Sequence, residues 1–106
     1  MIVDESFNPE QGRGCYRLTQ VHHLDGRTLR VRVHRDSYQG QSHATVEVLT
    51  PHLTWTELAE RPPADWWPST EPTPSRAALA PVAAHLVERA RAILSDPTGP
   101  LPPGSC

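Results

Sequence analysis

Residues 27–34 and 43–49 alternate apolar and polar side chains with a period of two. This period places successive side chains on opposite faces of a β-strand, and β-branched residues at the apolar positions suit a half-buried sheet. We therefore predict two neighbouring strands, each with one buried side and one solvent-facing side. The predicted buried positions are Leu29, Val31, Val33, Ala44, Val46 and Val48.

The solvent-facing side of these two strands carries charges of both signs. Arg30 and Arg32 alternate with the buried positions of the first strand, and Glu47 alternates with those of the second. Opposite charges on facing strands stabilise a pair by roughly 0.2–1 kcal/mol. An Arg–Glu contact on this side would therefore help to fix the register of the sheet.

A further strand is predicted over residues 15–24, joined to the next by an Asp-Gly dipeptide. Asp-Gly between two strands favours a two-residue type I′ turn, because glycine readily adopts positive φ. That turn pairs Gln20 with Val31, whereas a three-residue turn with a bulge would pair Val21 with Val31. We favour the two-residue turn because it places Leu18 on the face of the valines.

Residues 54–61 fit two different elements. Thr54 and Glu57 have the spacing of a capping box, and Leu53 and Leu58 occupy the two positions of a hydrophobic staple. We favour a short helix on these grounds. Leu53 and Trp55 also alternate with Thr54 and Thr56, which fits a fourth strand, and this alternative stays open.

The C-terminal half contains a proline-rich crossover and a helix. Residues 62–74 hold five prolines, which oppose regular structure, and the pair Trp66-Trp67 is expected to anchor the crossover to the core. We place the main helix from Pro81 to about Ser95, because proline costs little at the first helical position. An irregular turn is expected before it. The apolar stripe that predicts this helix is Leu79, Val82, Ala83, Leu86, Ala90, Ile93 and Leu94.

These elements predict an α+β fold, in which a three-stranded antiparallel β-meander packs against the C-terminal α-helix. A short helix and the Pro-rich crossover lie between them. We expect one domain over residues 15–95, a flexible arm over 1–14 and a flexible Pro-rich tail over 96–106.

The cysteines and the hydropathy of the chain suggest a reducing compartment. No apolar stretch resembles a signal peptide or a membrane span, so we expect a cytoplasmic protein with no membrane contact. Cys15 and Cys106 are expected as thiols in such a compartment, although the sequence leaves open whether they pair.

Charge is distributed unevenly along the 106 residues, whose net charge is −2. The chain contains ten arginines and no lysine, a bias typical of a GC-rich genome. Residues 13–43 carry six arginines against two aspartates, whereas both flanking segments are acidic. This asymmetry indicates either a binding face or a fold whose charges neutralise one another.

The candidate binding residues are Arg30, Arg32, Tyr38 and Trp67. We predict a small, non-catalytic binding or accessory domain that acts through a protein partner or by self-association. The alternative is a nucleic-acid-binding module that uses the basic hairpin face, since arginine contacts both phosphates and bases. The acidic net charge and the absence of lysine argue against it.

A second alternative is a His-rich metal-binding protein. His22, His34 and His43 are the candidate ligands, but the chain lacks the short-range His and Cys spacings typical of zinc sites. We expect no cofactor. The sequence also contains no nucleophile elbow, phosphate-cradling loop or paired-carboxylate motif, which favours a protein without catalytic activity.

Overall fold

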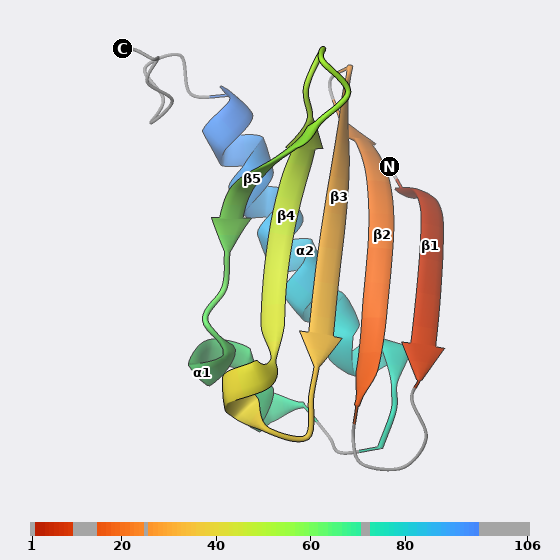
Figure 1. Ribbon diagram of the computed structural model, residues 1–106, viewed down its shortest axis with the longest axis vertical. Helices are drawn as coiled ribbons and strands as arrows, with labels where there is room; N and C mark the ends of the chain where they lie inside the picture. Colours follow the sequence, from red (N-terminus) through yellow and green to blue (C-terminus); the bar gives the residue numbers. More distant parts are fainter. Residues whose placement is uncertain (1, 10–14, 25, 71–72, 96–106) are drawn as a thin grey trace.

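The computed structural model describes residues 2–9, 15–24, 26–70 and 73–95. A five-stranded antiparallel sheet, ordered β1-β2-β3-β4-β5, carries helix α2 diagonally across one face (Figure 1). The elements are β1 (Ile2–Pro9), β2 (Tyr16–Leu24), β3 (Arg27–Arg35), β4 (His43–Leu49), β5 (Trp55–Glu60), α1 (Pro63–Trp66), α2 (Arg76–Ser95) and two single 3-10 turns, Gln39–Gln41 and Trp67–Ser69. The α+β class is thereby confirmed, whereas the predicted number of strands is wrong.

The two-residue turn between β2 and β3 is confirmed by the register. Gln20 pairs with Val31, and Leu24 pairs with Arg27 across the turn. Gly26 adopts a φ of 77°, a left-handed conformation that glycine reaches without a steric penalty. The side chain of Gln20 consequently points to the same face as Val31.

One contiguous core fills the space between the sheet and α2. The helix packs against β2, β3, β4 and β5, and it leaves β1 largely uncovered. We call the helix-covered face of the sheet the inner face and the opposite face the outer face. The buried apolar side chains are Tyr16, Leu18, Leu24, Leu29, Val31, Val33, Ala44, Val46, Val48, Trp66, Leu79, Val82, Ala83, Leu86, Val87 and Ala90.

Strand β1 occupies the segment that we expected to be a flexible arm. Its residues pair in antiparallel fashion with β2, from Ile2 opposite His22 to Pro9 opposite Tyr16. Phe7 packs edge-on against the Tyr16 ring at a centroid distance of 6.0 Å. This strand was not predicted because most of its side chains are exposed, so its sequence shows no alternation of apolar and polar residues; the strand is held mainly by backbone hydrogen bonds to β2.

Strand β5 corrects the short helix that we favoured over residues 54–61. The Thr54 hydroxyl lies 2.8 Å from the Thr50 hydroxyl, within a turn that leads into β5, so it does not cap a helix. Leu53 has a φ of 64° and is 79% exposed, so it takes no part in a staple. The alternative that the sequence left open, a further strand, is the one observed.

Helix α2 begins five residues before the position that we predicted. It starts at Arg76 and includes Pro81 within the helix. A proline there lacks the N–H that would close one helical hydrogen bond. The Pro81 ring is exposed, whereas Leu79 is fully buried in the first two turns, and burial of this apolar surface offsets the missing bond.

The proline-rich crossover is more regular than we predicted, because it contains the single-turn helix α1 followed by a 3-10 turn. Trp66 is buried in the core, and its Nε1 donates to the Arg61 carbonyl oxygen at 3.2 Å. This burial is consistent with the prediction that Trp66 anchors the crossover to the core.

The tail predicted over residues 96–106, including Cys106, lies outside the described residues, as do residues 10–14 of the predicted arm. No helix in the described part of the chain is long and apolar enough to cross a membrane.

Two neighbouring positions of β4 provide a test of the inner and outer faces. Val46 is fully buried and faces α2, whereas Thr45 lies on the outer face opposite Arg32. We expect Val46→Asp to lower the free energy of unfolding by at least about 3 kcal/mol, because it buries an unpaired charge. Thr45→Asp adds the same charge outside the core, between Arg32 on β3 and Glu60 on β5, whose opposite effects offset each other, so it should destabilise far less. Chemical denaturation followed by circular dichroism measures both; equal destabilisation would contradict this assignment of faces.

Candidate functional site

Arg30 and Arg32 lie on the outer face of the sheet, where both contact Glu47. Arg30 Nε donates to Glu47 Oε1 at 2.8 Å, and Arg32 Nη2 donates to Glu47 Oε2 at 3.2 Å. Trp55 on β5 completes the arrangement, because the Arg30 guanidinium carbon lies 4.3 Å from the centre of its ring. We call these four residues the Arg30 cluster.

Tyr38 and Trp67 lie at a different place in the fold. Tyr38 is 71% exposed in the loop after β3. Trp67 is half-buried, and its Nε1 donates to the Asp36 carbonyl oxygen at 2.8 Å. The buried Arg35 stacks on the Trp67 ring, with its guanidinium carbon 4.7 Å from the ring centre. Trp67 therefore holds the crossover against the end of β3, and the four candidate binding residues do not form one site.

The three candidate metal ligands lie on both faces of the sheet. His34 and His43 pair directly across β3 and β4 on the outer face, with ring centroids 5.2 Å apart. His22 lies on the inner face and is only 8% exposed. The sheet therefore separates His22 from the other two. Among the described residues, no group of three His, Cys, Asp or Glu side chains is placed to hold a metal ion.

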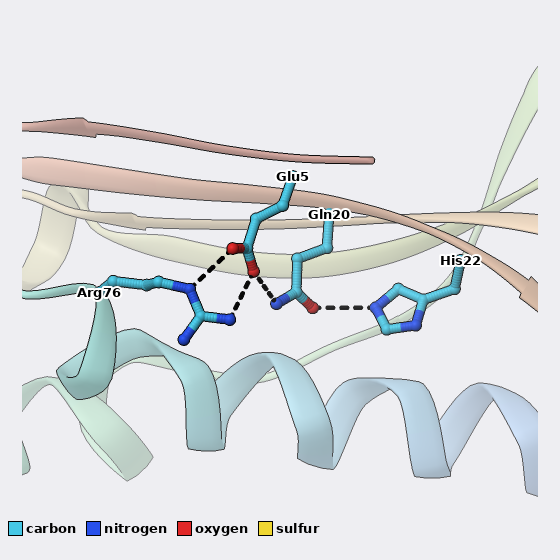
Figure 2. A network of polar contacts seen from close by, with 4 residues as sticks. All are labelled: Glu5, Gln20, His22 and Arg76. Carbon is cyan, nitrogen blue, oxygen red and sulfur yellow. Dashed lines mark hydrogen bonds and ion pairs between the residues drawn. The ribbon is translucent and has the colours of Figure 1, made fainter. Parts of the chain in front are cut away.

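A chain of polar contacts on the inner face links β1, β2 and the start of α2 (Figure 2). Arg76 donates to both carboxylate oxygens of Glu5, through Nε and Nη2, each at 2.7 Å. Gln20 Nε2 donates to Glu5 Oε2 at 2.7 Å. Gln20 Oε1 lies 2.9 Å from His22 Nε2. We call these four residues the Glu5 network.

The ionised carboxylate of Glu5 fixes the direction of every hydrogen bond in this network. A carboxylate only accepts, so Gln20 must turn its NH₂ group towards Glu5 and its oxygen towards His22. That oxygen also only accepts, so His22 Nε2 must carry the proton. In the neutral imidazole this leaves Nδ1 as a lone-pair acceptor.

Two pKa shifts are consistent with this assignment. The hydrogen bonds from Arg76 and Gln20 lower the pKa of Glu5 from 4.5 to about 2, so the carboxylate is ionised at neutral pH. Burial lowers the pKa of His22 below its ordinary value, so its imidazole is neutral at the same pH.

A groove lies beside the Glu5 network, between the uncovered part of the sheet and α2. Its volume is about 290 Å³. Ile2 forms one apolar wall, and Ala80, Ala84 and Val87 form the other. His22 lines the groove between them. The groove is therefore mainly apolar, and the neutral imidazole of His22 offers a hydrogen-bonding group at its side.

The Glu5 network and its groove were not predicted from the sequence. Glu5 and Arg76 are separated by 71 positions, and no short motif connects them. One signal was available, because Gln20 and His22 interrupt the apolar side of β2 with two polar residues. Buried polar side chains require partners, so these positions indicate that polar groups from elsewhere in the chain meet them.

Comparisons of the chain with protein families, curated proteins and solved structures find no match.

The Glu5 contacts predict a specific pH dependence of stability. The folded-state pKa of Glu5 is about 2 against an ordinary value of 4.5, so its contacts stabilise fully above pH 4.5 and are lost as the pH falls towards 2. We expect Glu5→Gln to lower the Tm by at most about 5 °C at neutral pH, because the Arg76 contact is exposed to solvent. The difference from wild type should disappear near pH 2.

The control is Glu60→Gln, which removes an exposed carboxylate at the opposite edge of the sheet. Its Tm should stay close to that of the wild type over the same range. A Glu5→Gln effect that does not change with pH would show that the loss has another cause. Differential scanning calorimetry measures both variants.

Proposed function

We propose that this chain is a non-catalytic binding domain that recognises a protein partner through the outer face of its sheet. The observation that carries the proposal is the Arg30 cluster. Helix α2 covers the inner face, whereas the outer face is open along β2, β3 and β4 in the described part of the chain. The cluster lies within this open face.

The residue types in the cluster favour protein recognition. Arginine and tryptophan supply a large share of the binding energy at protein interfaces. Arg30 is held between the Trp55 ring and the Glu47 carboxylate, and Glu47 is itself only 13% exposed. Such side chains lose little conformational entropy when a partner binds, because their positions are already restricted.

The balance of charge on the outer face favours a protein over nucleic acid. Pairing across the strands places three arginines and four carboxylates on the outer face among the described residues. These residues are Arg17, Arg30 and Arg32, with Asp4, Glu47, Glu57 and Glu60. A phosphate backbone requires an excess of positive charge, which this surface lacks.

Site-specific photocrosslinking in the cells that express the protein tests the proposal. A benzophenone side chain at Thr45, on the outer face, should give protein adducts of defined mass, whereas the same group at the exposed His85 of α2 should not. Adducts at twice the mass of the chain would identify a second copy as the partner. Trp55→Ala should remove the Thr45 adducts without unfolding the domain, since Trp55 lies outside the core.

Two results would contradict the proposal. Equal adducts from both positions would show that the outer face has no special role. Adducts that disappear on nuclease treatment would indicate nucleic acid as the partner.

The mixed charge of the outer face should also prevent stable binding to DNA. At about 150 mM salt, where the Debye length is near 8 Å, we expect no stable complex with duplex DNA in a gel-shift assay. The triple variant Glu47→Gln, Glu57→Gln, Glu60→Gln removes three of the carboxylates and should bind DNA weakly at low salt. A stable wild-type complex that is lost in the double variant Arg30→Glu, Arg32→Glu would favour the nucleic-acid alternative.

A further inference from the structure

The groove between β1 and α2 is lined by a histidine on β2 that has one ring nitrogen left as a hydrogen-bond acceptor. His22 is more than nine-tenths buried, and its Nε2 proton is donated to Gln20. Figure 2 shows the other ring nitrogen, Nδ1, on the side that faces α2. In the part of the chain that the structure describes, the Gln20 contact at Nε2 is the side-chain hydrogen bond found for His22, and no donor is found at Nδ1. An accessible lone pair therefore points from β2 towards the groove.

The walls of the groove limit the chemistry of a ligand. Ala80 and Ala84 lie four residues apart on the same side of α2, so a shallow apolar strip runs along the helix. Ile2 closes this strip from the β1 side. A hydrocarbon chain laid along it would remove apolar surface from water on both sides, at roughly 25 cal/mol per Å².

The charged groups at the groove disfavour an ionic ligand. The guanidinium of Arg76 is already neutralised by Glu5 in a two-point contact, so an anion would have to compete with that carboxylate. The carboxylate of Glu88 at the rim would repel a second anion. An ammonium group would have to give up its water for a mainly apolar space with one neutral acceptor, which is costly.

We propose that this groove binds a small aliphatic alcohol, whose hydroxyl group donates a hydrogen bond to His22 Nδ1 while its hydrocarbon chain lies between Ile2 and the Ala80–Ala84 strip. A hydroxyl is the neutral donor that a single imidazole acceptor requires. This site lies on the inner side of the sheet and is separate from the Arg30 cluster, so it goes beyond the proposed protein-binding function.

The proposal is tested by titrating the isotope-labelled protein with three six-carbon probes and following the NMR chemical shifts of its backbone amides. At pH 7.5, 1-hexanol should give saturable shifts at the amides of His22 and Ala84. Hexylamine should bind at least several-fold more weakly, and hexanoate should cause no saturable shift. Affinity should rise by up to about fourfold for each methylene added from butanol to hexanol, as expected for burial of a CH₂ group.

Two variants examine the two parts of the site. Ala84→Leu fills the groove from an exposed helix position and should abolish the hexanol shifts, whereas Ala92→Leu makes the same change elsewhere on α2 and should leave them unchanged. His22→Phe removes the acceptor and should weaken hexanol binding by about fivefold, the value of one net hydrogen bond. A thermal melt of each variant establishes that it is folded.

Three outcomes would overturn the proposal. The first is the absence of a saturable shift up to the solubility limit of hexanol. The second is tighter binding of hexanoate or hexylamine than of hexanol. The third is unchanged hexanol affinity in folded Ala84→Leu, which remains informative even if His22→Phe fails to fold.

Discussion

The register of the β2–β3 hairpin is the constraint on which the rest of the structure depends. Because side chains alternate between faces, a slip of one residue would turn Leu18 outward and bring Arg17 or Thr19 under α2. The two-residue turn at Gly26 excludes that slip. The same register that buries the valines of β3 also brings Gln20 and His22 to the inner face, so the polar network and the core are set by one turn.

The sequence predicted the parts of the fold whose apolar pattern is regular. Strand β4 was placed at its observed bounds, because its alternation is uninterrupted. The edge strands β1 and β5 were missed or misassigned. Each of them pairs with a single neighbour and buries few side chains, so its sequence carries a weak apolar pattern. The start of α2 was misplaced because the prediction considered only the hydrogen bond that Pro81 would lose inside a helix. In the structure the helix begins at Arg76, and the turn before Pro81 buries Leu79 in the core.

In the candidate sites, contacts between neighbouring strands could be predicted from the sequence, whereas contacts between distant elements could not. The contact between Arg30 and Glu47 followed from strand alternation, since both residues lie on neighbouring strands of a predictable pair. The contact between Glu5 and Arg76 did not, because it joins an edge strand to a helix through a tertiary arrangement that no local pattern encodes. The same applies to Trp67, whose position depends on where the crossover returns to the end of β3.

The edge strands β1 and β5 also affect how two copies of the chain could associate. An exposed strand edge offers free backbone groups to any passing strand and is a common starting point for aggregation. Here β1 carries Asp4 and Glu5, β5 carries Glu57 and Glu60, and the pairing of each strand with its neighbour contains an irregularity. Like charges would meet if two copies joined edge to edge, and the bulges distort the line of hydrogen-bonding groups. The acidic side chains and the irregular pairing of β1 and β5 therefore oppose edge-to-edge pairing of two copies, and they leave the outer face as the part of the sheet open to association.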